Sequence, residues 1–192
     1  MTLPIRPRRL RASETMRRMV RDIQLSPNDF IYPLFVVHGR DIRRPISSMP
    51  GVAQLSVDQA RREAGEAVEL GIPAIILFGL PAEKDPIGRE NFAENGIVQQ
   101  TARAIKAEYP ELMVITDVCL CEYTDHGHCG LVNPETGEIL NDETLEVLQK
   151  VALSHAAAGA DIVAPSGMID GMVGAMRAAL DQAGFCQVTI LS

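Results

Sequence analysis

The residues with the clearest potential for chemistry begin at Asp117, where three of the chain's four cysteines fall within eleven residues. Asp117, Cys119 and Cys121 alternate along an apolar run, so on a strand their side chains point to one face. A carboxylate and two thiols side by side are costly to bury unless something pairs with them. Zinc would do so, because thiolates bind it tetrahedrally at about 2.3 Å and the two sulfurs of a Cys-x-Cys pair can reach one ion.

The loop that follows offers a third sulfur. Gly127 and Gly130 allow the chain to fold back and deliver Cys129, and no fourth cysteine follows at ligand spacing. Three protein ligands with one open position are typical of catalytic zinc sites. Two alternatives remain at this point: the cysteines could be small buried apolar residues, or His126 or His128 could complete a closed structural site. A histidine in such a loop could also orient a ligand through a hydrogen bond.

Apolar runs that alternate with helical patterns indicate how these residues are held. Continuous apolar strands between helices are typical of a parallel sheet with both faces covered. Ser56 with Gln59 predicts a capping box, Asp142 a helix N-cap, and Gly71, Gly159 and Gly184 helix ends. The pattern predicts strands at 30–37, 74–78, 113–119, 160–165 and 188–191, and helices at 13–22, 56–70, 97–108, 142–158 and 171–183.

Two α/β architectures share this alternation, an open doubly wound sheet and a (β/α)8 barrel. The long loops with unusual residues follow the first three strands, and chemistry at consecutive strand ends favours the barrel. No glycine-rich phosphate fingerprint follows the first strand, which weakens a dinucleotide-binding alternative. We therefore predict a TIM-barrel type fold with only about the first five strands present, since a full barrel takes ~250 residues. An extended arm at 1–29 would precede this incomplete barrel at 30–192.

The predicted arm is basic, although the whole chain carries a net charge of −7. Its first 21 residues contain seven arginines and only one acidic residue, Glu14. An acidic remainder would repel phosphates, so nucleic acid is not an expected partner, and Pro4 and Pro7 disfavour a transit peptide. We expect the arm to dock on a neighbouring subunit.

Apolar runs and cysteine usage indicate where in the cell the protein is expected to be. No apolar run approaches the ~20 residues of a membrane span, and the start lacks the apolar region of a signal peptide, so no membrane partner is expected. Four cysteines without a disulfide-like spread favour a reducing compartment, and we expect a cytoplasmic protein.

The segment Asp117-Val-Cys-Leu-Cys-Glu-Tyr-Thr-Asp-His-Gly-His-Cys-Gly130 closely resembles the metal-binding segment of zinc-type porphobilinogen synthases, also called 5-aminolevulinate dehydratases. Weaker matches follow in order across nearly the whole chain: Arg6 to Arg11, Met49-Pro-Gly51, Leu77-Phe-Gly79 and Ala164 to Gly171. The resemblance implies an enzyme that condenses two 5-aminolevulinate molecules to porphobilinogen, an early step of tetrapyrrole and haem biosynthesis. It further implies Zn²⁺ as cofactor and a homo-octamer, and leaves room for an additional Mg²⁺ in the full-length protein.

The resemblance also implies roles for particular residues. The implied zinc ligands are Cys119, Cys121 and Cys129; the implied catalytic residues are Asp117, which would hold a substrate amino group, and Ser166, an active-site hydroxyl. By residue type alone Ser166 could equally be a cap or turn residue, and Asp170 is a plausible helix N-cap before it is a catalytic group.

The family's mechanism also uses two lysines that form Schiff bases, and such lysines must be partly desolvated at strand ends. Lys84 lies in a polar loop, and Lys106 and Lys150 lie on or near helices, so none is expected to fit. The resemblance places the first Schiff-base lysine just after the segment that ends at Ser192. We therefore expect the N-terminal part of the enzyme, cut before its nucleophile. The alternatives are another carbonyl-condensing barrel with the same metal loop, and a non-catalytic zinc-binding or assembly fragment.

Overall fold

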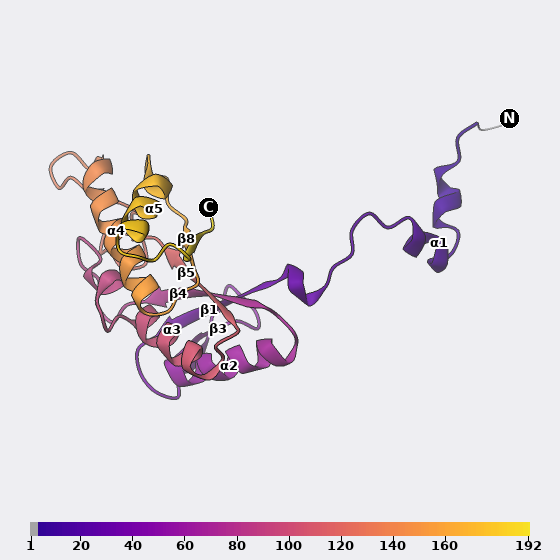
Figure 1. Ribbon diagram of the computed structural model, residues 1–192, viewed down its shortest axis with the longest axis horizontal. Helices are drawn as coiled ribbons and strands as arrows, with labels where there is room; N and C mark the ends of the chain where they lie inside the picture. The colour runs from indigo at the N-terminus through magenta and orange to yellow at the C-terminus, as the bar shows by residue number, and fades with distance from the viewer. Residues whose placement is uncertain (1–3) are drawn as a thin grey trace.

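The protein is built around a seven-stranded sheet in the computed structural model, which describes residues 4–192. The strand order is β2-β3-β1-β4-β5-β8-β9 (Figure 1). Five of these strands are parallel and are added in chain order from β1 onwards, without a reversal of direction along the sheet. They are β1 (Ile31–Val37), β4 (Ala74–Leu80), β5 (Met113–Val118), β8 (Ile162–Pro165) and β9 (Thr189–Ile190). The predicted parallel α/β arrangement and its five strands are thereby confirmed.

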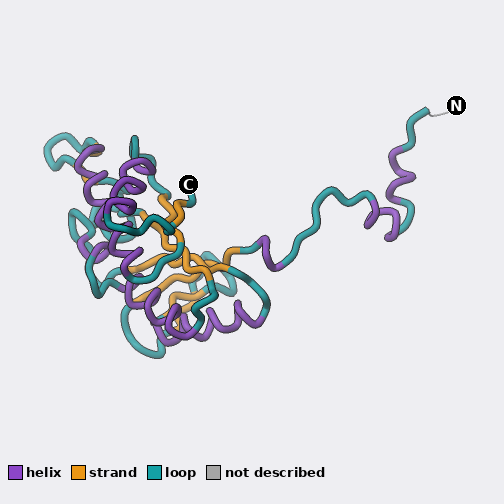
Figure 2. The backbone as a smooth tube through the Cα atoms, viewed as in Figure 1, coloured by secondary structure: helices purple, strands orange, loops and turns teal. Residues whose placement is uncertain are grey.

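Four helices connect the parallel strands, and they lie together on one side of the sheet (Figures 1 and 2). They are α2 (Val57–Glu69), α3 (Ile97–Glu108), α4 (Asn141–Ala157) and α5 (Met172–Gln182). In α2 the buried positions are 59, 60, 63, 64 and 67, the spacing of a single helix face. The glycines predicted to end α2, α4 and α5 have φ values of 75°, 99° and 86°, a backbone region that other residues rarely adopt.

The two faces of the sheet differ in their cover. The helix-side face holds the most deeply buried aliphatic residues, including Val36, Ile75 and Leu77, all at 0% exposure. The opposite face holds a smaller apolar cluster around Ile115, with Phe35 and Phe78 stacked at 5.2 Å between ring centroids on the neighbouring strands. Because side chains alternate along a strand, Asp117 shares this second face with Ile115.

Short strands in the connecting loops were not predicted. β2 (Arg43–Pro45) and β3 (Ala53–Leu55) form an antiparallel pair in the loop after β1, and β3 pairs in parallel with β1. β6 (Leu131–Val132) and β7 (Ile139–Leu140) form a separate two-stranded sheet before α4. These segments are only two or three residues long, too short for an alternating pattern to register in the sequence.

Three predicted helix starts are corrected by the structure. Ser56 is the N-cap of α2, but the capping box is absent because the Ser56 hydroxyl donates to Asp58 and Gln59 donates to Asp41. α4 begins at Asn141, so Asp142 lies in its first turn rather than at the cap. The N-cap of α5 is Gly171, not Asp170.

Residues 4–29 extend away from the rest of the molecule (Figure 1). They contain the 3-10 helices η1 (Pro7–Arg11) and η2 (Pro27–Asp29) and the helix α1 (Glu14–Met19), which ends earlier than the predicted residue 22. Ser13 caps α1 as predicted, accepting a hydrogen bond from the Met16 amide at 3.1 Å. Residues 1–3 of the predicted arm lie outside the described residues. Across residues 4–192, none of the helices combines the length and apolarity needed to cross a bilayer.

Candidate metal centre

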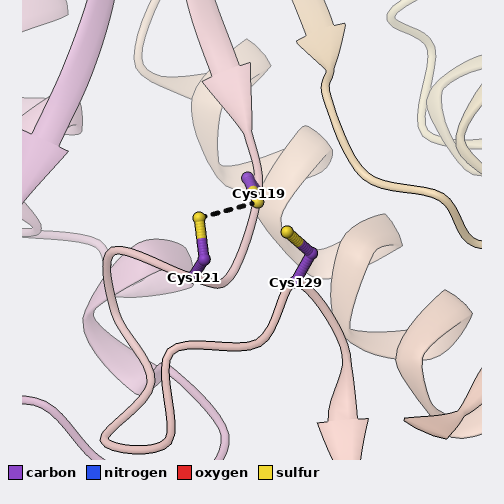
Figure 3. A group of neighbouring side chains, drawn as sticks. All are labelled: Cys119, Cys121 and Cys129. Atoms are coloured by element: carbon purple, nitrogen blue, oxygen red, sulfur yellow. Dashed lines mark hydrogen bonds between the residues drawn. The ribbon is translucent and has the colours of Figure 1, made fainter.

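Three cysteine side chains converge just beyond the end of β5. Cys119 follows the strand directly, Cys121 lies two residues further on, and Cys129 lies on the returning chain (Figure 3). Their sulfur atoms all lie within 4.8 Å of one another, and the sulfurs of Cys119 and Cys121 are 3.3 Å apart. Cys119 is 3% exposed and the other two are partly buried. The structure therefore brings together the three residues that the sequence singled out as metal ligands.

The loop returns because of a hydrogen-bonded turn directly after Cys119. The carbonyl oxygen of Leu120 accepts hydrogen bonds from the amides of Tyr123 and Thr124, both at 2.9 Å. The buried Thr124 hydroxyl lies 3.0 Å from the carbonyl oxygens of both Leu120 and His128, so it links the start of the loop to its end. Gly127 has φ 73° at the reversal, as expected for a residue that must turn the chain. The turn places Cys129 opposite the Cys-x-Cys pair.

Gly130 is required for a different reason from the one predicted. A Cβ atom here would lie 2.8 Å from the Ile139 side chain and 3.0 Å from the Thr144 hydroxyl. That same hydroxyl accepts a hydrogen bond from the Leu131 amide at 2.9 Å. The glycine thus allows the end of the metal loop to pack closely against β7 and α4, without a positive φ.

The two loop histidines are engaged outside the sulfur cluster. The His126 Nδ1 atom accepts a hydrogen bond from the His128 amide at 3.1 Å, so its Nε2 atom carries the hydrogen that it donates to the Pro86 carbonyl at 3.2 Å. Across residues 4–192, neither histidine belongs to a group of side chains close enough to share a metal ion. The geometry favours three sulfur ligands over a closed site with a histidine.

Burial keeps two of the thiols protonated. It raises the pKa of Cys119 to about 11, and burial together with the adjacent Glu122 carboxylate raises the pKa of Cys121 above its usual range. The Cys121 thiol lies 3.0 Å from Glu122 Oε2, the acceptor of its hydrogen bond. A metal ion binds thiolates, so it must displace these protons when it loads. Clustered thiolates are soft ligands, which suit a soft or borderline metal ion.

Asp117 and Ser166 lie side by side because their strands do. β5 and β8 pair in parallel, with Asp117 opposite Ala164, so Ser166 follows directly at the end of the neighbouring strand. Burial raises the pKa of Asp117 to about 6, while hydrogen bonding with the Ser166 hydroxyl lowers it. Asp117, Cys119 and Glu122 form a second group of possible ligand atoms within 4.8 Å. Glu122 was not selected from the sequence, although its place next to Cys121 was a usable signal.

An open cavity of about 450 Å³ lies beside this cluster. Three parts of the chain line the cavity: the end of the cysteine loop, the β7–α4 junction and the segment that follows β8. The lining residues are His128, Cys129, Gly130, Ile139, Asn141, Ser166, Gly167, Met168 and Ile169. Small-molecule sites usually occupy clefts of roughly 300–1,000 Å³ with a few convergent polar groups. A small polar ligand placed here would reach Cys129 and Ser166 together.

The family model described as delta-aminolevulinic acid dehydratase matches residues 4–192. The chain belongs to the delta-aminolevulinic acid dehydratase family. This confirms the resemblance found in the sequence, and it does so over almost the whole chain. Among dehydratases of the same name, one from Halalkalibacterium halodurans is 55% identical over 97% of this chain and 56% of its own length. Another, from Synechococcus elongatus, is 56% identical over 97% of this chain and 58% of its own length.

A solved structure agrees with the family assignment. The delta-aminolevulinic acid dehydratase (porphobilinogen synthase) of Toxoplasma gondii ME49, in complex with the reaction product porphobilinogen, matches with a TM-score of 0.93 and 40% identity. The match covers 99% of this chain and 55% of that chain. The chain thus spans a little over half the length of these dehydratase relatives.

Proposed function

We propose that this chain provides the metal centre and part of the substrate pocket of an enzyme that condenses two molecules of 5-aminolevulinate to porphobilinogen. The observation that carries the proposal is the convergence of three thiols with Asp117 and Ser166 at the carboxyl ends of two adjacent parallel strands. The Toxoplasma gondii relative, which shares this fold, was solved with porphobilinogen bound. The comparisons lend no support to the alternative of a non-catalytic zinc-binding or assembly protein.

The donor set fits a zinc ion with one open position. Cys119, Cys121 and Cys129 would hold the ion, and the cavity beside Cys129 leaves room for a small ligand next to it. When bound, the ion would supply Lewis-acid chemistry to a substrate carbonyl, amine or water.

Asp117 and Ser166 would orient the substrate. The carboxylate of Asp117 is partly buried on the face of the sheet away from the helices, where an ion pair with a substrate ammonium is screened less than in open water. The exposed Ser166 hydroxyl, on the wall of the cavity, would add a hydrogen bond from the neighbouring strand. Together they would hold one substrate molecule against the sulfur cluster.

We propose that the Schiff-base lysines come from elsewhere in the enzyme. Lys106 is held by Asp161 and by the carbonyl oxygens of Pro110 and Leu112, and Lys84 and Lys150 are exposed. None of the three is the desolvated, unpaired amine that Schiff-base formation needs. The sheet described here is open, with β2 and β9 at its edges. In the proposed enzyme, further strands would close it into a (β/α)8 barrel.

Turnover is expected to depend on zinc. In the enzyme that contains this chain, a strong chelator should lower porphobilinogen formation by roughly 100-fold or more, and added zinc should restore it. The measurement is product formation beside metal content by mass spectrometry. Asp117→Asn is the matched variant: we expect it to retain zinc and to lose turnover, because it keeps the shape of the side chain but removes the charge. Full turnover without metal would reject the proposed role of the site.

We further propose that residues 4–25 dock on a second copy of the chain within a homo-octamer. Six large apolar side chains in this segment are more than 40% exposed, and contact with a second copy would remove them from water. Seven arginines accompany them, whereas the chain as a whole is acidic. Apolar contact and charge attraction therefore both favour the acidic body of a second copy.

Deletion of residues 1–25 is expected to shift the protein to smaller oligomers. Zinc content should stay unchanged, because among residues 4–25 no side chain belongs to the sulfur cluster. Sedimentation velocity gives the size, and metal content gives the control. An assembly of unaltered size would contradict the docking role.

A further inference from the structure

The metal loop rests on the segment that follows β4. The Asp85 amide donates to the Tyr123 carbonyl at 3.2 Å, and the Asp125 amide donates to the Asp85 carbonyl at 3.3 Å. Deeper in the molecule, the Asn91 Nδ2 atom donates to the Cys119 carbonyl at 2.6 Å. Asn91 lies in the 3-10 helix η3 (Arg89–Phe92) and is 1% exposed. A buried side chain from a distant loop thus holds the backbone of the first thiol residue.

The backbone of Asn91 is held in turn by the side chain of Gln99. The side chain of Gln99, on α3, donates to the Asn91 carbonyl at 2.8 Å and to the Ser154 hydroxyl, on α4, at 2.9 Å. Gln99 is completely buried. These contacts fix the backbone of Asn91 between the two helices. The side-chain Nδ2 atom of Asn91 then holds the Cys119 carbonyl in the metal loop.

The side-chain amide of Asn91 is only half satisfied. The Asn91 Oδ1 atom is buried without a hydrogen-bond partner in the part of the chain that the structure describes. A buried polar atom without a partner is destabilising; an apolar side chain of similar size would avoid that penalty but would leave the Cys119 carbonyl without its donor. The single hydrogen bond that Asn91 makes through its side chain goes to Cys119. Its specific contribution is thus made at the metal loop.

We propose that Asn91 is a positioning residue of the metal centre, which sets the orientation of Cys119 before a metal ion binds. At Cys119 the extended strand ends and the turn through Leu120 begins, so the peptide between them is free to rotate unless its carbonyl is held. Rotation about the backbone bonds on either side of that peptide shifts the following chain, which carries Cys121 and Cys129, relative to the Cys119 sulfur. Partners of metal ligands typically change metal affinity by roughly 10–100-fold when removed. The inference rests on the proposed zinc-binding role of the three thiols.

The test compares Asn91→Leu with Gln99→Leu in the whole protein. Both changes replace a buried amide that has one unpaired oxygen, but only the first removes the bond to Cys119. Zinc affinity is measured by competition with a chelator, the thiolate-to-metal absorption is measured after loading with Co²⁺, and the melting temperature is measured without metal. For Asn91→Leu we expect roughly 10–100-fold weaker zinc binding and an altered Co²⁺ spectrum. For Gln99→Leu we expect a clearly smaller loss of zinc affinity than for Asn91→Leu, with a lower melting temperature, because Gln99 acts on the Cys119 carbonyl only through Asn91.

Asn91→Ala serves as a second variant, since it removes the same donor without adding bulk. Wild-type zinc affinity and Co²⁺ spectrum in a folded Asn91 variant would overturn the proposal. So would equal weakening in Gln99→Leu, which would mean general loosening of the core, or failure of both Asn91 variants to fold, which would assign Asn91 to fold stability. A wild-type protein without thiolate absorption on Co²⁺ loading would instead reject the metal centre itself, and the role of Asn91 with it.

Discussion

Replacement of Cys119, Cys121 or Cys129 by alanine is expected to lower zinc affinity by roughly 100-fold or more, while the fold survives. The estimate follows because apparent zinc-binding free energies of about 10–16 kcal/mol, shared among three ligands, leave about 3–5 kcal/mol for each. The fold should survive because the core around β1, β4 and β5 is aliphatic, and loss of one sulfur atom costs about 1 kcal/mol. Metal content by mass spectrometry, beside circular dichroism, measures both effects.

Three control variants make this result specific. Cys186→Ala should leave zinc bound, because Cys186 is exposed and lies outside the sulfur cluster. His126→Ala and His128→Ala should also retain zinc, since within residues 4–192 neither histidine is close enough to the sulfur cluster to share its ion. If the cysteine variants unfold, or a histidine variant loses its zinc completely, the site is a closed structural one and the catalytic interpretation is wrong.

His155 is expected to make the folded protein lose stability in mild acid. It is completely buried in α4, and burial lowers its pKa from 6.5 to about 4, weakly opposed by the nearby backbone of Asn91. Between these two values the unfolded chain binds a proton at His155 that the folded chain does not. The free energy of unfolding therefore falls as pH falls from 6.5 towards 4, by about 2 kcal/mol between pH 7 and pH 5 from this residue alone. Urea unfolding at the two pH values measures the change.

The matched variant is His155→Leu, which keeps an apolar group of similar size and cannot take up a proton. Carboxylates elsewhere contribute to acid sensitivity in both proteins, so the difference between the two pH slopes isolates His155. Neither ring nitrogen is paired within residues 4–192, and the nearby Asn91 carbonyl already accepts a hydrogen bond from Gln99, so the substitution leaves that carbonyl paired. Equal loss of stability in the two proteins would show that the histidine is solvated or charged in the folded state.

Much of the fold was predictable because its signals are local. Helices often end at a residue that tolerates a positive φ, and Gly71, Gly159 and Gly184 mark three such ends. A buried parallel strand needs a short apolar run, and the five runs all became strands. The helix-start errors concern the hydrogen-bond partners of side chains and not the existence of the helices. Ser56 and Gln59 have the spacing of a capping box, but Asp58 and Asp41 lie closer to their polar groups in the folded chain.

Some residues of the candidate site were also predictable from local signals, and others were not. The sulfur cluster was predictable because its three members lie in one short segment, where strand alternation and a glycine turn limit the possible geometries. The neighbouring Ser166 was reached through the family resemblance, since its approach to Asp117 depends on the pairing of β5 with β8. Asn91 was not reached at all. It lies 28 residues before Cys119 in an irregular loop, where no periodic pattern or spacing rule applies.

The sequence by itself determined which residues are candidate metal ligands and the order of the strands and helices, because residue type and short-range periodicity carry that information. Only the tertiary structure decided which groups act together. Strand register placed Ser166 beside Asp117, the loop after β4 brought Asn91 against Cys119, and helix packing enclosed His155 without a polar partner among the described residues. The physical reason is that burial and hydrogen bonding between distant segments depend on how whole elements pack.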